Sequence, residues 1–361
     1  MRGRSASVAI GDIAGSVLKC AVVVAMLLRP GNAHAQVCVD RLYHAPEGGI
    51  PIRVASPVSE PLISLFVAGQ SEPIAQARTR AGTSDLLALF PDLHSLANGS
   101  VLMAQLESDG VRCGSPLVVE PLTPVARATD AWSARVLRSM DSNDRGSIES
   151  LLRMPPRARE SLRLSVEVEA TSDRVSHAWR VYESSLVVLT TSEGSVTLGL
   201  RPDAAPRAVF HFRALVEGGF YDGPGLSCVR DSETRQPAFF QGGDPVGDGS
   251  GGAGTVVPFE QSGLNVRPGV VAMARVAGEP QSASSQFVIV LSARAAAAVA
   301  ESATPFAVVL DGGATLAALS RQSPSRSRVI RACLVPAPPY EGVFEPTFEP
   351  ISESSATVPG R

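Results

Sequence analysis

The sequence predicts a mainly β chain made of a small β-sandwich, a partly helical connector and a larger β-rich block. Over residues 36–122, short apolar or alternating runs are separated by Gly, Pro, Asn and Ser. Residues 123–182 change to the three- and four-residue apolar spacing of helices. Residues 183–337 return to strand patterns around one helix-like stretch. At 361 residues, the chain is long enough for two domains with separate cores.

Residues 1–35 have the pattern of a secretion signal. Arg2 and Arg4 come early, an apolar run extends from Cys20 to Leu28, and Ala33-His34-Ala35 has the small-x-small pattern of a cleavage site. The apolar run is shorter than the roughly 20 residues that span a bilayer. We therefore expect cleavage after Ala35 and export to the periplasm or the medium. An uncleaved membrane anchor is the alternative.

Removal of this signal leaves four cysteines, an even number that favours disulfides in an exported chain. Four cysteines allow three pairings. Cys38 and Cys113 bracket the N-terminal region, so a bridge between them is the preferred pairing. A metal site is not expected, because no two cysteines have C-x-x-C spacing. The formal net charge of −3 is too small to indicate a nucleic-acid partner.

The first two regions are predicted element by element. The strand-like stretches of residues 36–122 are IPIRVAS, PLISLFVAG, SVLMAQLES and SPLVVEPL, whose spacing favours an immunoglobulin-like sandwich. In the connector, ATDAWSARVLRSMD has helical spacing after a capping Thr129 or Asp130. GSIESLLRM is a second helical piece that ends at Pro155-Pro156, and ESLRLSVEVEA then alternates like a strand.

The last block opens with a hairpin and a helix. SSLVVLTTSEGSVTLGL reads as two strands that turn at Glu193-Gly194. Pro206 stands where the first turn of a helix tolerates proline, and apolar residues recur at helical steps until Gly218-Gly219. The tail, residues 338–361, is rich in Pro, Glu and Ser and is expected to be disordered or loosely docked.

Four ordered segments carry a family resemblance. They are GSVTLGLRPDAAPRAVFHFRALVEGGFYDG, FFQGGDPVGDGSGGAG, GVVAMARVAGEPQSASSQFVIV and TPFAVVLDGG. Together they resemble the cyclophilin-type peptidyl-prolyl isomerases, in particular bacterial members, over residues 183–337. The resemblance implies a closed antiparallel eight-stranded β-barrel with two capping helices. It also implies a groove for proline-containing segments, here those of exported proteins, and no cofactor or metal.

The same resemblance assigns roles to single residues. Gln241 matches the glutamine that helps hold the substrate carbonyl and steadies a catalytic arginine, and Gln286 matches a second groove residue. Phe239 matches an apolar wall, with a one-residue uncertainty against Phe240, and Phe287 is expected to point into the barrel. The strand edge that pairs with the peptide is matched by Met273, Ala274 and Arg275.

Isomerisation of an X-Pro bond makes simple chemical demands. The barrier of about 18–20 kcal/mol comes from amide resonance, and uncatalysed crossing takes tens to hundreds of seconds. A donor aimed at the proline nitrogen stabilises the twisted bond but not the planar one, so it lowers the barrier. An arginine suits this task because it is always protonated and presents several donors.

The chain departs from the family pattern where that arginine is expected. The family's Phe-His-Arg triplet reads Leu226-Ser227-Cys228 here, so Cys228 occupies the arginine position and cannot donate a charged hydrogen bond. Residues 231–236 look like an insertion. Arg230 shares a strand face with Cys228 and is the candidate catalytic replacement, with Arg235 as an alternative.

The expected proline pocket is also changed. Val288 stands where the family has an aromatic floor, and Ala303 where a histidine or tyrosine closes the site. Smaller walls bury less apolar area on binding, so we expect weakened catalysis. Three functions stay open: an isomerase that assists folding of exported proteins, an inactive module that binds proline-containing segments, and a structural protein.

Overall fold

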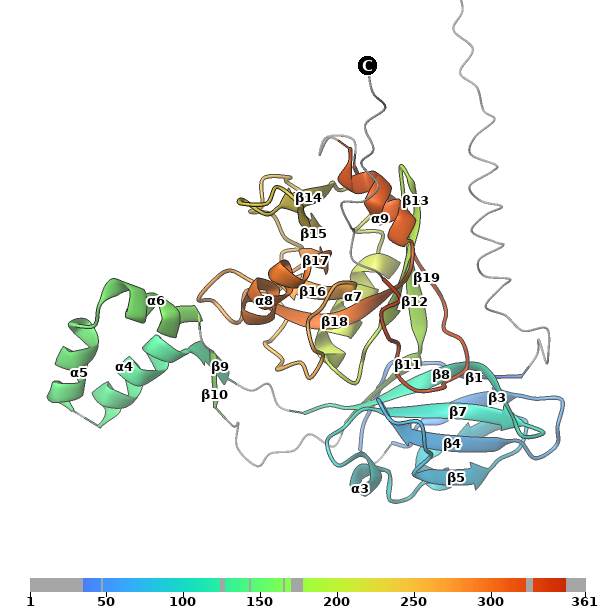
Figure 1. The fold of residues 1–361 in the computed structure, drawn as a ribbon. Helices are drawn as coiled ribbons and strands as arrows, with labels where there is room; N and C mark the ends of the chain where they lie inside the picture. The colour runs from blue at the N-terminus through green and yellow to red at the C-terminus, as the bar shows by residue number, and fades with distance from the viewer. Residues whose placement is uncertain are drawn as a thin grey trace, which may run out of the picture.

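The computed structural model describes residues 35–46, 48–123, 127–142, 144–164, 166–169, 178–322 and 327–348. Residues 1–34, which hold nearly all of the predicted signal, and residues 349–361 of the tail lie outside this range. Figure 1 shows two β-rich parts and a helical lobe between them in sequence. Among the described residues, no helix is both long enough and apolar enough to span a bilayer.

The N-terminal part consists of two antiparallel sheets that share one hydrophobic core. Alternation directs Val37, Ile52 and Val54 into this core, which also contains the fully buried Trp179. The three-stranded sheet has the order β1-β3-β6 and the six-stranded sheet β2-β11-β8-β7-β4-β5. The elements are β1 (Gln36–Val39), β2 (Tyr43–His44), β3 (Pro51–Ala55), β4 (Leu62–Val67), β5 (Ala75–Arg78), β6 (Gly82–Asp85), α2 (Leu86–Leu89), α3 (Leu93–Ala97), β7 (Leu102–Ser108), β8 (Val111–Pro121) and β11 (Trp179–Glu183).

Strand β11 belongs to the six-stranded N-terminal sheet, although it comes from the end of the predicted connector. The sandwich predicted over residues 36–122 stays a prediction, but its larger sheet takes one strand from the end of the predicted connector. Strand β11 lies between β2 and β8, pairing Trp179 with Pro121 and Glu183 with Leu117. The connector is therefore an excursion that leaves the N-terminal sheet and returns to it.

The connector contains the three-helix lobe drawn in green in Figure 1. Asp130 and Asp144 cap the first two helices, accepting hydrogen bonds from the backbone N–H groups of Ser133 and Ser147 at 2.9 and 3.1 Å. The lobe is joined to the rest through a two-stranded ladder. Its elements are β9 (Arg127–Asp130), α4 (Ala131–Asp141), α5 (Arg145–Leu152), α6 (Pro156–Leu164) and β10 (Val166–Glu169).

The C-terminal part is one eight-stranded antiparallel sheet, with the order β14-β15-β17-β16-β18-β13-β12-β19. The predicted hairpin and helix are both present, and Pro206 lies in the first turn of α7. The ring of Phe212 on α7 lies 4.8–5.5 Å from those of Tyr221, Phe287 and Phe306, so α7 closes the core. The elements are β12 (Ser185–Thr191), β13 (Gly194–Leu200), α7 (Pro206–Glu217), β14 (Leu226–Arg230), β15 (Pro237–Gly242), β16 (Val270–Ala274), β17 (Phe287–Val290), α8 (Ala293–Ser302), β18 (Ala303–Asp311), α9 (Gly313–Ser320) and β19 (Val329–Pro336).

The expectation of a closed barrel is wrong for this sheet, which is open between β14 and β19. The segments that lead into the two edge strands meet over a short stretch, at a bridge between Gly225 and Arg328, beside backbone hydrogen bonds that join Leu226 to Ser327 and Val329 to Gly223 and Pro224. Among the described residues, no ladder continues beyond this point. The pairing at this bridge is antiparallel, so β14 (from Leu226 on) and β19 (from Val329 on) both lead away from it in opposite directions and do not run alongside each other.

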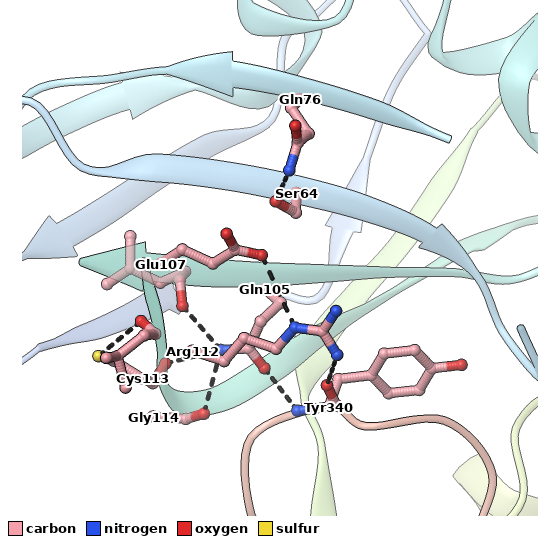
Figure 2. A network of polar contacts seen from close by, with 10 residues as sticks. Ser64, Gln76, Gln105, Glu107, Arg112, Cys113, Gly114 and Tyr340 are labelled. Carbon is pink, nitrogen blue, oxygen red and sulfur yellow. Dashed lines mark hydrogen bonds and ion pairs between the residues drawn. The ribbon is translucent and has the colours of Figure 1, made fainter. Parts of the chain in front are cut away.

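Residues 337–348, which include the start of the tail predicted from residue 338, are docked across both parts, and we call them the strap. Tyr340 is buried against the N-terminal sheet, where its backbone N–H donates to Gln105 Oε1 at 2.7 Å and its carbonyl accepts from Arg112 at 2.6 Å (Figure 2). Further along, Arg201 of the C-terminal part donates to Phe344 O at 3.0 Å. Phe348 packs against the core of the eight-stranded sheet. The strap therefore joins the two parts.

Two further features fix one part against the other. Only Ser184 separates β11 from β12, and its N–H donates to Pro116 O at 2.8 Å while its carbonyl accepts from Ala337 N–H at 3.2 Å. In addition, Arg180 forms a buried ion pair with Glu120 and lies 3.9 Å from the ring centre of Phe210 on α7. The N-terminal sheet and the C-terminal sheet are thus connected without a flexible linker.

Candidate functional site

Four adjacent strands place one row of side chains on the outer face of the eight-stranded sheet. Ser227 of β14 pairs with Gln241 of β15, Gln241 with Val288 of β17, and Val288 with Ala272 of β16. Directly opposed residues of an antiparallel sheet share a face. Ser227 is exposed and Gln241 half-buried, whereas Val288 is 6% exposed and Ala272 fully buried. This outer row therefore runs from a polar open end to an apolar covered end.

A chain of amide hydrogen bonds fixes the polar end. Gln241 Nε2 donates to Gln286 Oε1 at 2.7 Å, and Gln286 Nε2 donates to the carbonyls of Gly249 and Gly251 at 2.8 and 2.7 Å. Because carbonyl oxygens only accept hydrogen bonds, the NH₂ end of the Gln286 amide must face them, and its oxygen must face Gln241. Both protons of Gln286 are then used, and Gln241 keeps one N–H and its oxygen for a ligand.

The glycine-rich loop can approach Gln286 because of two local features. Gly243 has φ of +82°, and a Cβ there would lie 2.2 Å from the Ser285 carbonyl, so only glycine fits. Asp244 accepts hydrogen bonds from the backbone N–H groups of three loop residues, including Gly249 and Gly251. Burial alone would raise the pKa of Asp244, but these donors outweigh it and lower the pKa.

Comparison with known proteins identifies the C-terminal part. The family described as "Cyclophilin type peptidyl-prolyl cis-trans isomerase/CLD" matches residues 186–335. A peptidyl-prolyl cis-trans isomerase of Brucella suis biovar 1 is 32% identical over 139 residues, which cover 36% of this chain and 70% of that protein. The chain belongs to the cyclophilin-type peptidyl-prolyl cis-trans isomerase family.

Other relatives share the same cyclophilin part. Peptidyl-prolyl cis-trans isomerase-like 1 of Rhizopus delemar is 34% identical over 117 residues, covering 30% of this chain and 66% of that protein. The chain spans only 22% of a bifunctional phosphatase/peptidyl-prolyl isomerase of Streptococcus pyogenes and 10% of isomerase 9 of Schizosaccharomyces pombe. A crystal structure of a Cryptosporidium parvum cyclophilin with the dipeptide Ala-Pro matches with 24% identity and a TM-score of 0.35, over 42% of this chain and 98% of its own.

The cyclophilin part does not bring its candidate replacement arginine to the outer row. Arg230 donates to the carbonyls of Arg235 and Ser320, so its guanidinium is held beside the end of α9. The bulge at Val229/Arg230 interrupts the alternation on which the prediction of a shared face depended. Cys228 lies opposite Phe240 and packs against the core, where burial raises the pKa of its thiol.

Helix α8 covers the apolar end of the outer row. Three of its residues, Ala295, Ala296 and Val299, are buried in a cluster with Val288 and Ala303. The predicted floor and closing residue of the proline pocket, Val288 and Ala303, are consequently only 6% exposed each. The alanine-rich stretch Ala293–Ser302 is thus a helix that covers the expected position of the pocket.

Arginines hold both ends of α8. At its N-terminal end, Arg294 pairs with Asp231 and Glu233 of the predicted insertion at 3.1 and 2.8 Å. At the other end, Arg275 donates to Ala303 O at 3.1 Å and lies 4.9 Å from the centre of the Phe259 ring. Burial lowers the pKa of Arg275. Arg275 therefore stabilises the end of α8, in addition to following the strand edge where it was predicted.

The sheet register sorts the remaining predicted residues by face. Phe239 and Ala274 are half-buried on the outer face beside the α8 cluster, and Phe287 lies in the core as predicted. Phe240 is also in the core, which settles the uncertainty in favour of Phe239 as the outer residue. The Met273 side chain is fully buried and faces Phe287 inside the sheet, so only its backbone is left for a peptide, and the pairing of this strand edge with a peptide stays a prediction.

Sequence reasoning missed Ser227, the residue that lies opposite Gln241. The family resemblance aligns the catalytic arginine with Cys228, the next residue, and so points past Ser227. The pattern Leu226-Ser227-Cys228 could have found it, since Leu226 is an evident core residue and its neighbour on a strand must point outward.

The predicted bridge between Cys38 and Cys113 is wrong, because both are free thiols. Cys38 follows the core residue Val37 on β1, so alternation points it away from the core that Cys113 enters. Their sulfurs instead approach the carbonyls of Arg53 and Val111, at 3.8 and 3.2 Å.

Proposed function

We propose that residues 186–335 bind proline-containing polypeptide segments at the outer row and isomerise their X-Pro bonds with weakened catalysis. The observation that carries this proposal is the fixed Gln241–Gln286 pair beside an apolar floor. An apolar floor favours the proline ring, and a fixed amide can bind the neighbouring backbone without reorganisation.

Two features support weakened catalysis. The outer row carries no cation, and a charged hydrogen bond contributes about 1.5–3 kcal/mol where a neutral one contributes about 0.5–1.5 kcal/mol. Each ~1.4 kcal/mol of lost transition-state stabilisation costs tenfold in rate. In addition, α8 must move before Val288 can receive a proline ring, because its side chains occupy that space.

Binding without turnover is a second candidate function, and the position of α8 favours it. If α8 stays on Val288 and Ala303, a peptide can contact only the polar end of the outer row. Gln241 then still has one N–H and one oxygen for the peptide backbone. Such a site would hold extended segments and leave the X-Pro bond unchanged.

Turnover on an X-Pro tetrapeptide separates these functions. We expect faster isomerisation than in buffer, and a loss of at least about tenfold in Gln241→Ala, because the fixed amide is removed. Gln76→Ala, an exposed glutamine of the N-terminal sheet with one hydrogen bond to Ser64, is the matched control and should retain the rate. Binding by calorimetry without turnover would support the second function. Neither binding nor turnover would contradict both.

We further propose that the clients are exported proteins, since residues 1–35 have the pattern of a secretion signal. Cell fractionation followed by N-terminal sequencing tests this. A chain that starts at Gln36 outside the cytoplasm is expected, whereas one that keeps residues 1–35 in the membrane fraction would support the anchor instead.

A further inference from the structure

We infer that Ser227 and Gln241 together supply the hydrogen bond to the proline nitrogen, as a neutral pair in place of the arginine. This inference rests on the proposed function. It assigns a catalytic role to Ser227, an exposed serine of β14.

The outer row places both donors next to the position of the reacting bond. Side chains directly opposed on neighbouring strands have Cβ atoms about 4.5–5.5 Å apart, so the side chains of Ser227 and Gln241 leave the sheet as neighbours on one face. Val288 is two strands from Ser227, or roughly 10 Å at the usual strand spacing. Once α8 has moved off Val288, a proline ring against Val288 with its nitrogen facing the polar end would place that nitrogen over Gln241 and within reach of Ser227.

The donor inventory of the site favours the same two residues. Both Gln286 protons are held by Gly249 and Gly251, so Gln286 can only accept. Val288 and Ala272 have no polar group. The Ser227 hydroxyl rotates freely about its bond, and Gln241 has one unused N–H.

The neighbours of Ser227 cannot take its place. Cys228 points into the core opposite Phe240, and a thiol is a weak donor. The Arg230 guanidinium is bound to the carbonyls of Arg235 and Ser320. The proline nitrogen becomes basic only as the bond twists, so a neutral donor still acts selectively on the transition state.

The inference predicts distinct effects from neighbouring substitutions. Ser227→Ala should lower kcat/KM about fivefold, as expected for one neutral hydrogen bond, with the Kd of the tetrapeptide unchanged. Ser227→Arg should raise kcat/KM at least about tenfold, because it puts a guanidinium opposite Gln241. Cys228→Ala, the core-facing neighbour, is the control and should leave the rate unchanged. The wild-type rate should be flat between about pH 5 and 9, because neither donor titrates there.

The measurement is isomerisation of the X-Pro tetrapeptide by exchange NMR, with unfolding curves to confirm that each variant folds. A Ser227→Ala rate equal to that of an active wild type overturns the inference and leaves the proposed function intact. An increase in Cys228→Arg but not in Ser227→Arg also overturns it. If the wild type has no turnover, the proposed catalysis is wrong, and the Ser227→Arg variant then tests the inferred position of Ser227. Turnover by this variant supports that position, and no turnover overturns the inference.

Discussion

Gln105→Ala tests whether the strap is part of the folded core. Gln105 is fully buried on β7, and its Nε2 donates to the carbonyls of Leu106 at 3.0 Å, Cys113 at 2.7 Å and Gly114 at 3.4 Å (Figure 2). Its Oε1 accepts from the backbone N–H of Tyr340 at 2.7 Å. The two protons of Nε2 can form strong hydrogen bonds with only two of these three carbonyls. Together with the bond from Tyr340 N–H, three effective hydrogen bonds depend on this side chain.

The expected loss follows from those three bonds. Each buried hydrogen bond contributes about 0.5–1.5 kcal/mol net, and a buried partner left unsatisfied costs about 1–3 kcal/mol. Gln105→Ala should therefore lower the free energy of unfolding by ~3 kcal/mol and detach the strap at Tyr340. Gln76→Ala removes a single bond from an exposed side chain to the buried Ser64 and should cost ~1 kcal/mol.

Urea unfolding followed by tryptophan fluorescence measures both variants, with amide exchange at Tyr340 as a local probe. The buried Trp179 reports the N-terminal core directly. If Gln105→Ala unfolds within ~0.5 kcal/mol of Gln76→Ala, and Tyr340 stays protected, the strap does not depend on this network and the reasoning is refuted.

The remaining predictions concern charge. Arg180→Met should lower the free energy of unfolding by about 3–5 kcal/mol, because it leaves Glu120 buried without its partner, whereas Arg138→Met removes an exposed pair and should cost ~1 kcal/mol or less in the same urea assay. Burial raises the pKa of Glu260 above 4.5, although the backbone N–H donors at the start of α7 act to lower it. The folded state therefore binds this proton more tightly than the unfolded state. Its contribution to stability therefore falls as the pH rises above 4.5, and Glu260→Gln should flatten that slope in urea curves taken at pH 4–7. Arg294→Ala removes both ion pairs at the start of α8, so amide exchange within α8 should become about two- to tenfold faster with global unfolding unchanged. Unaltered exchange would contradict the role given to Arg294.

Local patterns predicted the elements whose signals are contained in a few residues. The hairpin turn at Glu193-Gly194, the start of α7 at Pro206 and its end at Gly218 all agree with the structure. The resemblance located the pair of Gln241 and Gln286 before any geometry was known, because their order along the chain follows the family pattern.

The features that sequence reasoning missed depend on contacts between distant segments. β11 joins a sheet whose neighbouring strand β8 ends at Pro121, and nothing within Trp179–Glu183 encodes that partner. The faces of Met273 and Arg230 depend on register, which a single bulge in β14 changes. The alanine run of α8 has no aromatic anchor, so its packing on Val288 could not be read from its own pattern.

The single residue between β11 and β12 constrains how this protein is made. During synthesis β1 to β8 emerge first, but β2 cannot join their sheet until β11 emerges, and Ser184 then leads at once into the cyclophilin part. That part in turn waits for β19, the partner of β12 near the end of the chain. The N-terminal sheets therefore have all their strands once β11 is made, well before the cyclophilin part can be completed, and a gene cut after residue 122 would yield an unfinished sheet with an unpaired edge prone to aggregate.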